Sequence, residues 1–278
     1  MNTFVRLSVL GAMFLFLCSC SNTAQKISIS EIDTMPLVDV HCHAEMPGAG
    51  NTGNVLRMIV KEKMTYILML CSNYDSVLEM ALPYRKQVGI MLYFQPSMQG
   101  RYHILDSLTM AHRDIVRGYK LHPSALKHDI TTELLDSLFM LANKYNLLIV
   151  THTDSAWSCA SKYKPLLSKY PDTRLILYHA APAEEAFELV NAYKNVYLDV
   201  SFTAWGKDFQ QKALKAVGKD KILFGIDSPL GFPTDTDSLL PHFRQAAKEV
   251  AAFYNFDRET VESVFYKNAI RLLNLKNE

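Results

Sequence analysis

Eight short apolar runs, each followed by a longer amphipathic stretch, constrain the fold of this chain more than any other feature of its sequence. The runs are apolar almost throughout, which is typical of parallel strands buried on both faces; half-exposed antiparallel strands would alternate apolar and polar residues. The stretches between them, such as residues 131–146, repeat apolar side chains at helical spacings. The runs cover residues 36–41, 65–71, 88–94, 115–122, 146–152, 173–179, 195–201 and 221–227.

Eight strand-helix units predict an α/β fold closed into a (β/α)8 TIM barrel. An open parallel sheet would show the same local pattern, but eight units in one chain favour the barrel. The barrel domain is expected to cover residues 35–278, which is close to the ~250 residues typical of this fold. After the eighth run, residues 237–275 predict two or three helices that close the body.

Residues 1–19 have the features of a signal peptide. Arg6 precedes an apolar run that is too short to span a bilayer comfortably. The run ends in "LCSC", and the spacing of Leu17, Ser19 and Cys20 resembles the lipobox of bacterial lipoproteins. The resemblance implies cleavage before Cys20, a lipid on its thiol, and a location in the bacterial cell envelope, with the outer membrane or periplasmic face favoured. An ordinary secretory signal or an uncleaved anchor is the alternative.

Residues 20–34 are polar and lack a sustained apolar period, as expected of a tether between a lipid anchor and a folded body. Removing residues 1–19 takes away one arginine and no acid, which lowers Lys+Arg from 29 to 28, equal to the 28 Asp+Glu. This balance gives no electrostatic reason to expect a nucleic-acid partner. The cysteines beyond Cys20 show no paired spacing, so no disulfide framework is expected. The oligomeric state stays open.

Metal-competent side chains are concentrated where the apolar runs end. His41 ends the first run and His43 follows two positions later, so they project from the same face of a strand. Three later runs end in His152, His179 and Asp227. The carboxyl ends of all strands meet at one face of a (β/α)8 barrel, where such enzymes carry their active sites. Any single one of these histidines would more often be a packed core residue than a metal ligand. Four strands that all end in a possible ligand nevertheless indicate a metal site.

Strand alternation also predicts the direction in which the neighbouring side chains of the first strand point. Cys42 should point away from the two histidines, toward the helix layer. Asp39 should share the inward face with His41 and lie below it, where it could orient a ligand imidazole. An acid at the base of a strand, bonded to the backbone, is an equally weighted alternative.

The order of these residues, with H-x-H on the first strand and His, His and Asp on the fifth, sixth and eighth, is the pattern of the amidohydrolase superfamily. More closely, "VDVHCHAE", "GYKLHP", "ILYHA", "ILFGIDSP" and "NAIRLLNL" resemble the amidohydrolase-related (family 2) metal-dependent hydrolases, which include the aminocarboxymuconate-semialdehyde decarboxylases. The resemblance runs from about residue 37 to 275. It implies that His41, His43, His152 and Asp227 hold a divalent metal, usually zinc, with His179 close by.

The residue types are consistent with hydrolysis by metal-activated water. Zinc held by neutral imidazoles and one carboxylate lowers the pKa of bound water to about 7. Asp227 is expected to accept the proton of that water and to pass it to the leaving group. His179 is expected to stabilise a developing oxyanion, to assist the water, or to ligate a second metal, and the sequence does not choose among these roles.

Lys120 lies near the end of the fourth run and has two interpretations. In some relatives a lysine at the end of this strand is carboxylated and bridges two metals; in the family-2 branch it more often stays a cation that meets a substrate carboxylate or phosphate. We favour the cation, with a single zinc. His122 shares the parity of Lys120, and it either lines the mouth of the site or is a loop histidine beside Pro123.

Asp154 and Trp205 follow two other apolar runs and are candidates for contact with the substrate. Asp154 would attract a cationic or hydroxylated substrate, or would cap the next helix, which we consider the better prediction. Trp205 is expected to form a wall of the substrate pocket or to pack at the start of a helix.

The leading hypothesis is a cell-envelope enzyme, a metal-dependent hydrolase that cleaves a C–N or C–O bond of a small ester, lactone, amide or related compound. A non-oxidative decarboxylase of a small carboxylic acid is the alternative on the same scaffold. A lipoprotein that captures a solute without turnover is the alternative from another class. The expected partners are a small-molecule substrate and, through the lipid anchor, a membrane.

Overall fold

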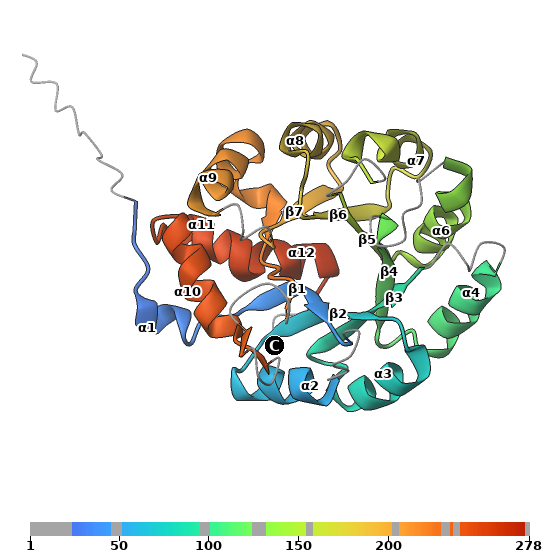
Figure 1. Ribbon diagram of the computed structural model, residues 1–278, viewed down its shortest axis with the longest axis horizontal. Coiled ribbons are helices and arrows are strands. Elements are labelled where there is room, and N and C mark those ends of the chain that lie inside the picture. Colours follow the sequence, from blue (N-terminus) through green and yellow to red (C-terminus); the bar gives the residue numbers. More distant parts are fainter. Residues whose placement is uncertain are drawn as a thin grey trace, which may run out of the picture.

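Eight parallel strands form one sheet in which each strand pairs with the next along the chain. The computed structural model describes residues 24–45, 52–94, 101–123, 132–153, 158–201, 206–228, 234–235 and 240–275. Figure 1 shows the strands at the centre and the helices around them. The predicted TIM barrel is therefore confirmed. The strands are β1 (Val38–His43), β2 (Tyr66–Cys71), β3 (Val88–Tyr93), β4 (Val116–Leu121), β5 (Leu148–His152), β6 (Arg174–Tyr178), β7 (Val196–Asp199) and β8 (Ile222–Leu223).

The barrel closes between β1 and the residues that follow β8. The carbonyl of Phe224 accepts a 2.9 Å hydrogen bond from the Val40 N–H. Farther along, the Ser228 N–H donates to the His41 carbonyl at 3.2 Å, and the Ser228 carbonyl accepts from the His43 N–H at 2.6 Å. Residues 224–228 therefore run beside β1 and carry Asp227 to the end of the barrel where the two histidines of β1 lie.

Helices cover the outside of the barrel between successive strands. After β8, a short antiparallel hairpin that the sequence did not predict, β9 (Thr234–Asp235) with β10 (Leu240–Pro241), precedes the closing helices. These are α10 (Phe243–Phe253), α11 (Arg258–Glu262) and α12 (Asn268–Leu273), as expected from the sequence. The outer helices are α2 (Thr52–Lys61), α3 (Tyr74–Ala81), α4 (Tyr102–Ala111), α6 (Thr132–Tyr145), α7 (Lys164–Lys169), α8 (Ala183–Ala192) and α9 (Gly206–Val217).

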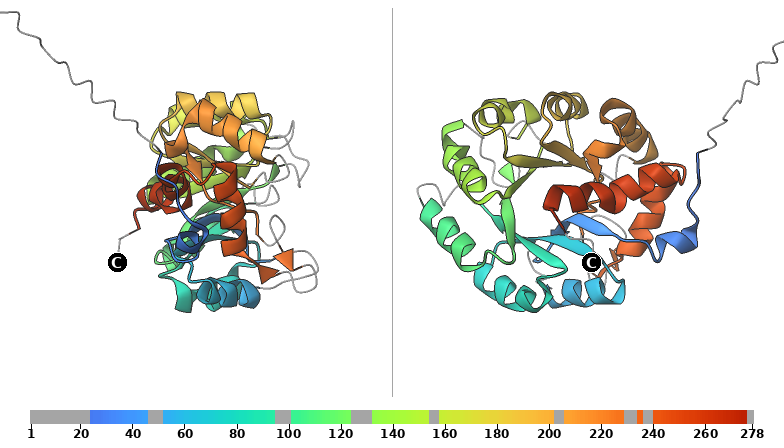
Figure 2. Two further views of the ribbon diagram at one scale, coloured as in Figure 1. Left: turned by 90° about the vertical axis from the view of Figure 1, so that its left-hand side faces the viewer. Right: turned by 180° about the vertical axis from the view of Figure 1, so that it is seen from behind.

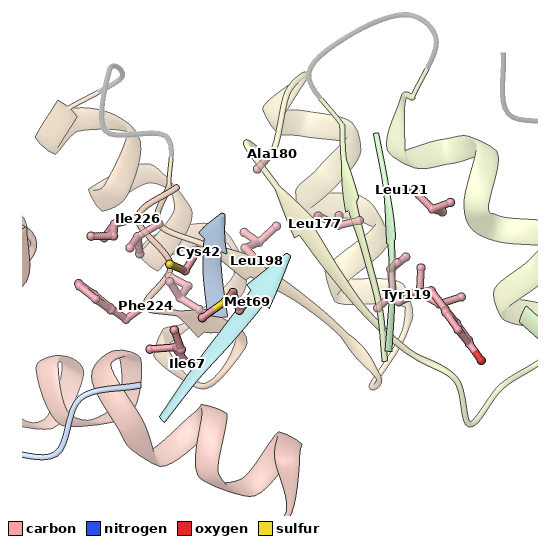
Figure 3. Close-up of a cluster of buried hydrophobic side chains, with 14 of the residues drawn as sticks. Cys42, Ile67, Met69, Tyr119, Leu121, Leu177, Ala180, Leu198, Phe224 and Ile226 are labelled. Carbon is pink, nitrogen blue, oxygen red and sulfur yellow. The ribbon is translucent and has the colours of Figure 1, made fainter. Parts of the chain in front are cut away.

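Alternate strand residues fill two separate apolar layers. On β2, Ile67 and Met69 pack toward the helices, whereas Leu68 and Leu70 belong to a cluster inside the barrel. Burial on both faces explains why the runs are apolar throughout. Figure 3 shows part of the helix-facing layer, which includes Cys42. The thiol thus faces away from the barrel interior, in agreement with strand alternation.

A bulge in β1 changes which of its residues face inward. Asp39 pairs with Ile67 and Cys42 with Met69, so that two residues of β1 stand opposite one residue of β2. Paired residues of neighbouring parallel strands share a face, and an extra residue resets the alternation. Asp39 therefore faces the helix-side layer with Ile67, and the expectation that it lies inward below His41 is wrong.

The described chain begins with a segment that packs against the body. Ser28 and Glu31 form a capping box at the start of the short helix α1 (Ile29–Ile32). Ile32 is fully buried, and Arg258 of α11 forms a 2.5 Å ion pair with Glu31. The end of the expected tether is therefore part of the packed body, because Ile27 and Ile32 bury apolar surface. The expected signal peptide and Cys20 lie outside the described residues.

None of the helices in the described part of the chain combines the length and apolar character that a membrane crossing requires.

Candidate metal centre

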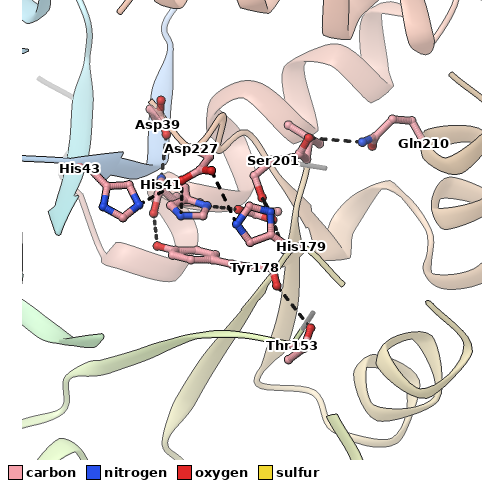
Figure 4. A network of polar contacts seen from close by, with 12 residues as sticks. Asp39, His41, His43, Thr153, Tyr178, His179, Ser201, Gln210 and Asp227 are labelled. Carbon is pink, nitrogen blue, oxygen red and sulfur yellow. Dashed lines mark hydrogen bonds and ion pairs between the residues drawn. The ribbon is translucent and has the colours of Figure 1, made fainter. Parts of the chain in front are cut away.

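Five of the predicted site residues converge at the carboxyl ends of the strands. Donor atoms of His41, His43 and His152 lie within 4.8 Å of one another, and so do those of His41, His179 and Asp227. His41 belongs to both groups, so the two sets share one centre. Figure 4 shows how His41, His43, His179 and Asp227 face each other.

Asp227 is the carboxylate at this centre. Its Oδ1 lies 3.1 Å from His41 Nε2 and 3.0 Å from His43 Nε2, and its Oδ2 lies 3.7 Å from His179 Nε2. Asp227 has a φ of 54°, a left-handed conformation that is uncommon for a non-glycine residue. The left-handed residue lies where the chain leaves the eighth strand. Backbone strain of this kind is often found at functional sites.

His41 is oriented by partners on two other strands. Its Nδ1 lies 2.7 Å from Asp199 Oδ2 at the end of β7, and both side chains are fully buried. The Tyr178 ring stacks on the His41 ring at a centroid distance of 3.6 Å, and the Tyr178 hydroxyl donates to the Val40 carbonyl. Because Asp199 accepts the Nδ1 proton, Nε2 is left as the metal-binding nitrogen of the neutral ring.

His179 reaches the centre through an irregular backbone. Tyr178 already faces inward at the end of β6, so strand alternation would turn the next side chain away. His179 instead adopts a φ of 61°. Its Nδ1 lies 3.3 Å from Ser201 Oγ, and that hydroxyl donates to Asp199 Oδ1 at 2.8 Å. Asp199 therefore contacts one histidine directly and orients a second through Ser201.

Asp39 bonds to the backbone, which is the alternative role expected of an acid at the base of a strand. Its Oδ1 accepts a 2.7 Å hydrogen bond from the backbone N–H of His41, and burial raises its pKa to about 8. The carboxylate that orients the His41 imidazole is Asp199, not Asp39.

Gly225 allows the eighth strand position to approach β1 closely. A Cβ at this position would lie 3.0 Å from the Cβ of His41, 3.0 Å from Val40 Cγ2 and 3.2 Å from the Cβ of Asp199. These distances are so short that a side chain at position 225 would push its neighbours away. The glycine therefore lets His41 and Asp199 keep their positions.

Lys120 and His122 lie next to the histidine cluster. Lys120 is fully buried, and its Nζ lies 4.3 Å from the centre of the Tyr178 ring, in cation–π range. The ring of His122 lies 3.8 Å from that of His152, so His122 belongs to the site rather than to a distant loop. Asp154 and Trp205 lie outside the described residues.

The electrostatics favour neutral rings for most of the imidazoles beside an ionised carboxylate. Burial lowers the pKa of His43. Burial also opposes protonation of His41, but Asp227 and Asp199 outweigh it and raise the pKa of that ring. Burial, aided by the charge of Lys120, lowers the pKa of His152 well below its usual range. Burial likewise lowers the pKa of His179 to about 4 and that of His122 to about 3. Burial opposes ionisation of Asp227, but His41 and His43 outweigh it and hold the pKa of that carboxyl below its usual range. Neutral imidazoles and an ionised carboxylate are the states that metal binding requires, so His41 must release its proton when a metal binds.

The donor set fits a divalent metal. His41 Nε2 and Asp227 Oδ1 are both buried, and neither makes a hydrogen bond of regular geometry to a described group. Their 3.1 Å separation is close to the ~3.4 Å expected between two ligand atoms of a tetrahedral zinc ion with bonds of ~2.1 Å. Imidazole nitrogen with one carboxylate suits zinc and also accommodates manganese or iron.

Sequence reasoning missed three residues of this site: Asp199, Tyr178 and Ser201. Asp199 had a signal, because it is an acid near the end of the seventh apolar run, a position similar to that of Asp227 in the eighth. Tyr178 and Ser201 had none, because their roles depend on contacts with β1 and with His179.

Comparison with known proteins supports the architecture. The amidohydrolase family model matches residues 107–275, more than half of the chain. No curated protein matches the sequence.

Several solved structures share the barrel. An uncharacterized TIM-barrel protein from Bordetella bronchiseptica superposes with a TM-score of 0.65 at 13% identity, over 87% of this chain and 99% of that one. A TatD homologue from Escherichia coli gives 0.64 at 16% identity, over 86% and 98%. A putative 2-pyrone-4,6-dicarboxylic acid hydrolase from Pseudomonas putida gives 0.60 at 12% identity, over 87% and 99%. Identities this low show a common fold alone. The family-model match, joined to this barrel, places the chain in the amidohydrolase family.

Proposed function

We propose that this amidohydrolase family member is a metal-dependent hydrolase with one zinc ion, acting on a C–N or C–O bond of a small ester, lactone, amide or related compound. The observation that carries the proposal is the convergence of His41, His43, His152, His179 and Asp227 from four strand positions on one buried centre. An ionised carboxylate buried among several imidazoles is costly to assemble unless a positive charge compensates it.

The chain's own residues divide the work of hydrolysis. A divalent metal at this centre supplies Lewis-acid chemistry and lowers the pKa of water to about 7. Asp227, with Oδ1 between two histidines, presents Oδ2 as the base that accepts a proton from water and passes it to the leaving atom. His179 Nε2 lies on the Oδ2 side of Asp227; because Nδ1 of the neutral ring donates to Ser201, Nε2 is an acceptor and is placed to assist the water by taking up a proton.

One metal is the better match to the donor geometry. His41 is common to both candidate donor groups, so they do not describe two separate sites. Lys120 lies against the face of the Tyr178 ring, a position that suits a cation. Metal analysis and intact mass under native conditions test this: two metals per chain, or added carbon dioxide on Lys120, would contradict it.

A non-oxidative decarboxylase is the second candidate, favoured by the same buried lysine. A fully buried ammonium group beside the histidine cluster would attract a substrate carboxylate. The Pseudomonas putida protein of the same fold is described as a hydrolase of a dicarboxylic acid, so a carboxylated substrate is compatible with either reaction.

A single screen separates these reactions. The zinc-loaded protein is incubated with lactones, esters, amides and aromatic carboxylic acids, and products are read by mass. Gain of water supports the hydrolase, and loss of carbon dioxide supports the decarboxylase. Asp227→Asn should abolish turnover while Asp172→Asn, a change at an exposed residue, leaves it unchanged. Zinc that binds stoichiometrically without turnover of any compound would favour solute capture instead.

We further propose that the protein is held at a bacterial envelope membrane by a lipid on Cys20. The support is the lipobox spacing of Leu17, Ser19 and Cys20. Labelling of the expressed protein with a radioactive fatty acid should be lost in Cys20→Ser and retained in Cys159→Ser; equal labelling of the two variants would refute the anchor.

A further inference from the structure

The face of the barrel opposite the metal centre contains two adjoining cavities. The larger, of about 610 Å³, is lined by residues that lead into β2 and β3 and by the end of α12. The smaller, of about 200 Å³, is lined by residues at the starts of β4, β5 and β6. Arg117, Leu273 and Asn274 line both. The two cavities therefore meet at Arg117, the second residue of β4.

The lining of these cavities is basic. Among the described residues, the lining includes five cations and no Asp or Glu; the cations are Arg85, Lys86, Arg113, Arg117 and Arg174. Asp114 Oδ2 lies 3.8 Å from Arg85 Nε, and both side chains are half exposed. An exposed pair at this distance neutralises little charge. The whole chain has a formal charge of only +1, so this face is a local excess of positive charge.

Two of the arginines are held by carbonyl groups rather than by carboxylates. Arg117 donates to the carbonyls of Asp114 at 2.9 Å and Val116 at 3.1 Å. Arg174 donates to the carbonyls of Leu272 and Asn146, while its Nε is buried without a hydrogen-bond partner among the described residues. Carbonyl groups fix a guanidinium but carry no formal charge. The positive charge therefore persists in a partly buried place, which is unfavourable until an anion enters.

The position of Arg117 depends on a glycine in the neighbouring strand. A Cβ at Gly89 would lie 2.5 Å from Arg117 Cγ and 2.5 Å from the Tyr66 hydroxyl. That hydroxyl is buried, lines the larger cavity, and makes no hydrogen bond of regular geometry within the described residues. Gly89 thus lets the arginine stem lie across the base of the barrel, beside a second donor.

We propose that these cavities form a binding site for a phosphate-bearing ligand, with Arg117 and Tyr66 at its base and Arg85 and Lys86 at its rim. Guanidinium groups match the geometry and charge of phosphate oxygens, and several cations without a carboxylate favour a multiply charged anion. The site is distinct from the metal centre, since it lies where the strands begin.

The phosphate has two chemical sources, a soluble phosphorylated compound or an anionic phospholipid headgroup. The described chain begins on the same side of the body as the end of α12, while the β9–β10 hairpin lies on the opposite side (Figure 2, left). A chain anchored through residues before 24 would thus have this basic face near the bilayer. The experiment must therefore separate the two sources.

The test uses the full chain and inorganic phosphate as probe, titrated calorimetrically against an equal ionic strength of chloride. Wild type should bind phosphate in preference to chloride, and the double variant R85Q/K86Q should weaken binding at least tenfold. The matched control is Lys207→Gln, which removes an exposed charge at the start of α9, on the other face. Arg117→Gln should abolish binding if it folds; the double variant keeps the test decisive if it does not.

A second arm compares sedimentation with phosphatidylglycerol and phosphatidylcholine vesicles. Excess binding to phosphatidylglycerol that the double variant loses assigns the site to lipid headgroups. Phosphate binding without such an excess assigns it to a soluble ligand. If phosphate binds no better than chloride, or if the double variant equals wild type in both arms, there is no such site.

Discussion

The imidazole of His41 and the carboxylate of Asp199 lie 2.7 Å apart although 158 positions separate them in the chain. Both side chains are fully buried, and the contact joins the first strand to the seventh. It sets which nitrogen of His41 faces the centre, and through Ser201 the same carboxylate also reaches His179. One residue therefore orients two of the histidines proposed to act at the metal.

Asp199→Asn should weaken metal binding. The amide fills the same space, but its oxygen carries no charge, so it holds the Nδ1 proton less strongly and makes Nε2 a poorer donor. We expect zinc affinity, measured by competition with a chromophoric chelator, to fall ~10- to 100-fold. Asp172→Asn serves as the control; equal affinity in wild type and Asp199→Asn would show that the contact does not act on the metal.

Ser201→Ala should release the His179 imidazole and leave His41 in place, because the hydroxyl links that ring to Asp199. The hydrogen bond from the His179 backbone N–H to Asp199 Oδ1 does not involve Ser201. In ¹⁵N-labelled metal-free protein, the imidazole signals of His179 should shift toward a mixture of tautomers while those of His41 stay unchanged. Ser201→Thr retains a hydroxyl and should restore the wild-type signals. Identical spectra for the Ala and Thr variants would remove Ser201 from this role.

Gly225→Ala should destabilise the fold near the site. The added methyl group meets His41 and Val40 at 3.0 Å in a packed region, and such overpacking costs about 1–3 kcal/mol. Metal affinity should fall as well, because His41 must shift. Gly53→Ala is the control: its added Cβ meets only Met80 at 3.5 Å, and alanine favours the helix α2. Urea unfolding gives both free energies; equal stabilities of the two variants would contradict the packing argument.

Removal of the metal should lower thermal stability reversibly. A ligand that binds only the folded state stabilises it by about 2.7 kcal/mol at a concentration of ~100 times its Kd. Dialysis against a chelator should therefore lower the Tm, and zinc should restore it. His43→Ala should show a smaller difference between the two conditions, and a Tm of wild type that does not respond to chelation would argue against a metal at this centre.

The attachment of the N-terminal segment should depend on pH through Glu31. Hydrogen bonds from Ser28, together with Arg258, lower the pKa of Glu31 from 4.5 to about 2. A carboxyl whose pKa is lower in the folded state stabilises the fold above its unfolded pKa, and this contribution disappears as pH falls from about 4.5 to about 2. Glu31→Gln should thus lower the Tm at pH 7 and have no effect near pH 2; a Tm difference independent of pH would exclude this role.

Much of the fold could be predicted because the relevant signals are local. Buried parallel strands require apolar runs, and outer helices require amphipathic ones, so the barrel and its closing helices followed from periodicity alone. The residues at strand ends could be nominated by the same reasoning, since all carboxyl ends of a barrel meet at one face.

The side-chain directions predicted from strand alternation were wrong where the backbone departs from a regular strand. The bulge in β1 turned Asp39 to the helix side, and the left-handed φ of His179 brought it inward next to Tyr178. A local pattern cannot show such departures, because the tertiary contacts around a residue compensate their cost.

By itself, the sequence determined the number and order of the eight barrel strands, the apolar layers on both sides of them, and which chemically active residues stand at their ends. Only the tertiary structure decided which of these residues touch. The contact of His41 with Asp199, and the place of Asp227 between His41 and His43, exist because residues 224–228 bond to β1 and close the barrel. Closure joins segments far apart in the chain, and no local periodicity encodes the distance between them.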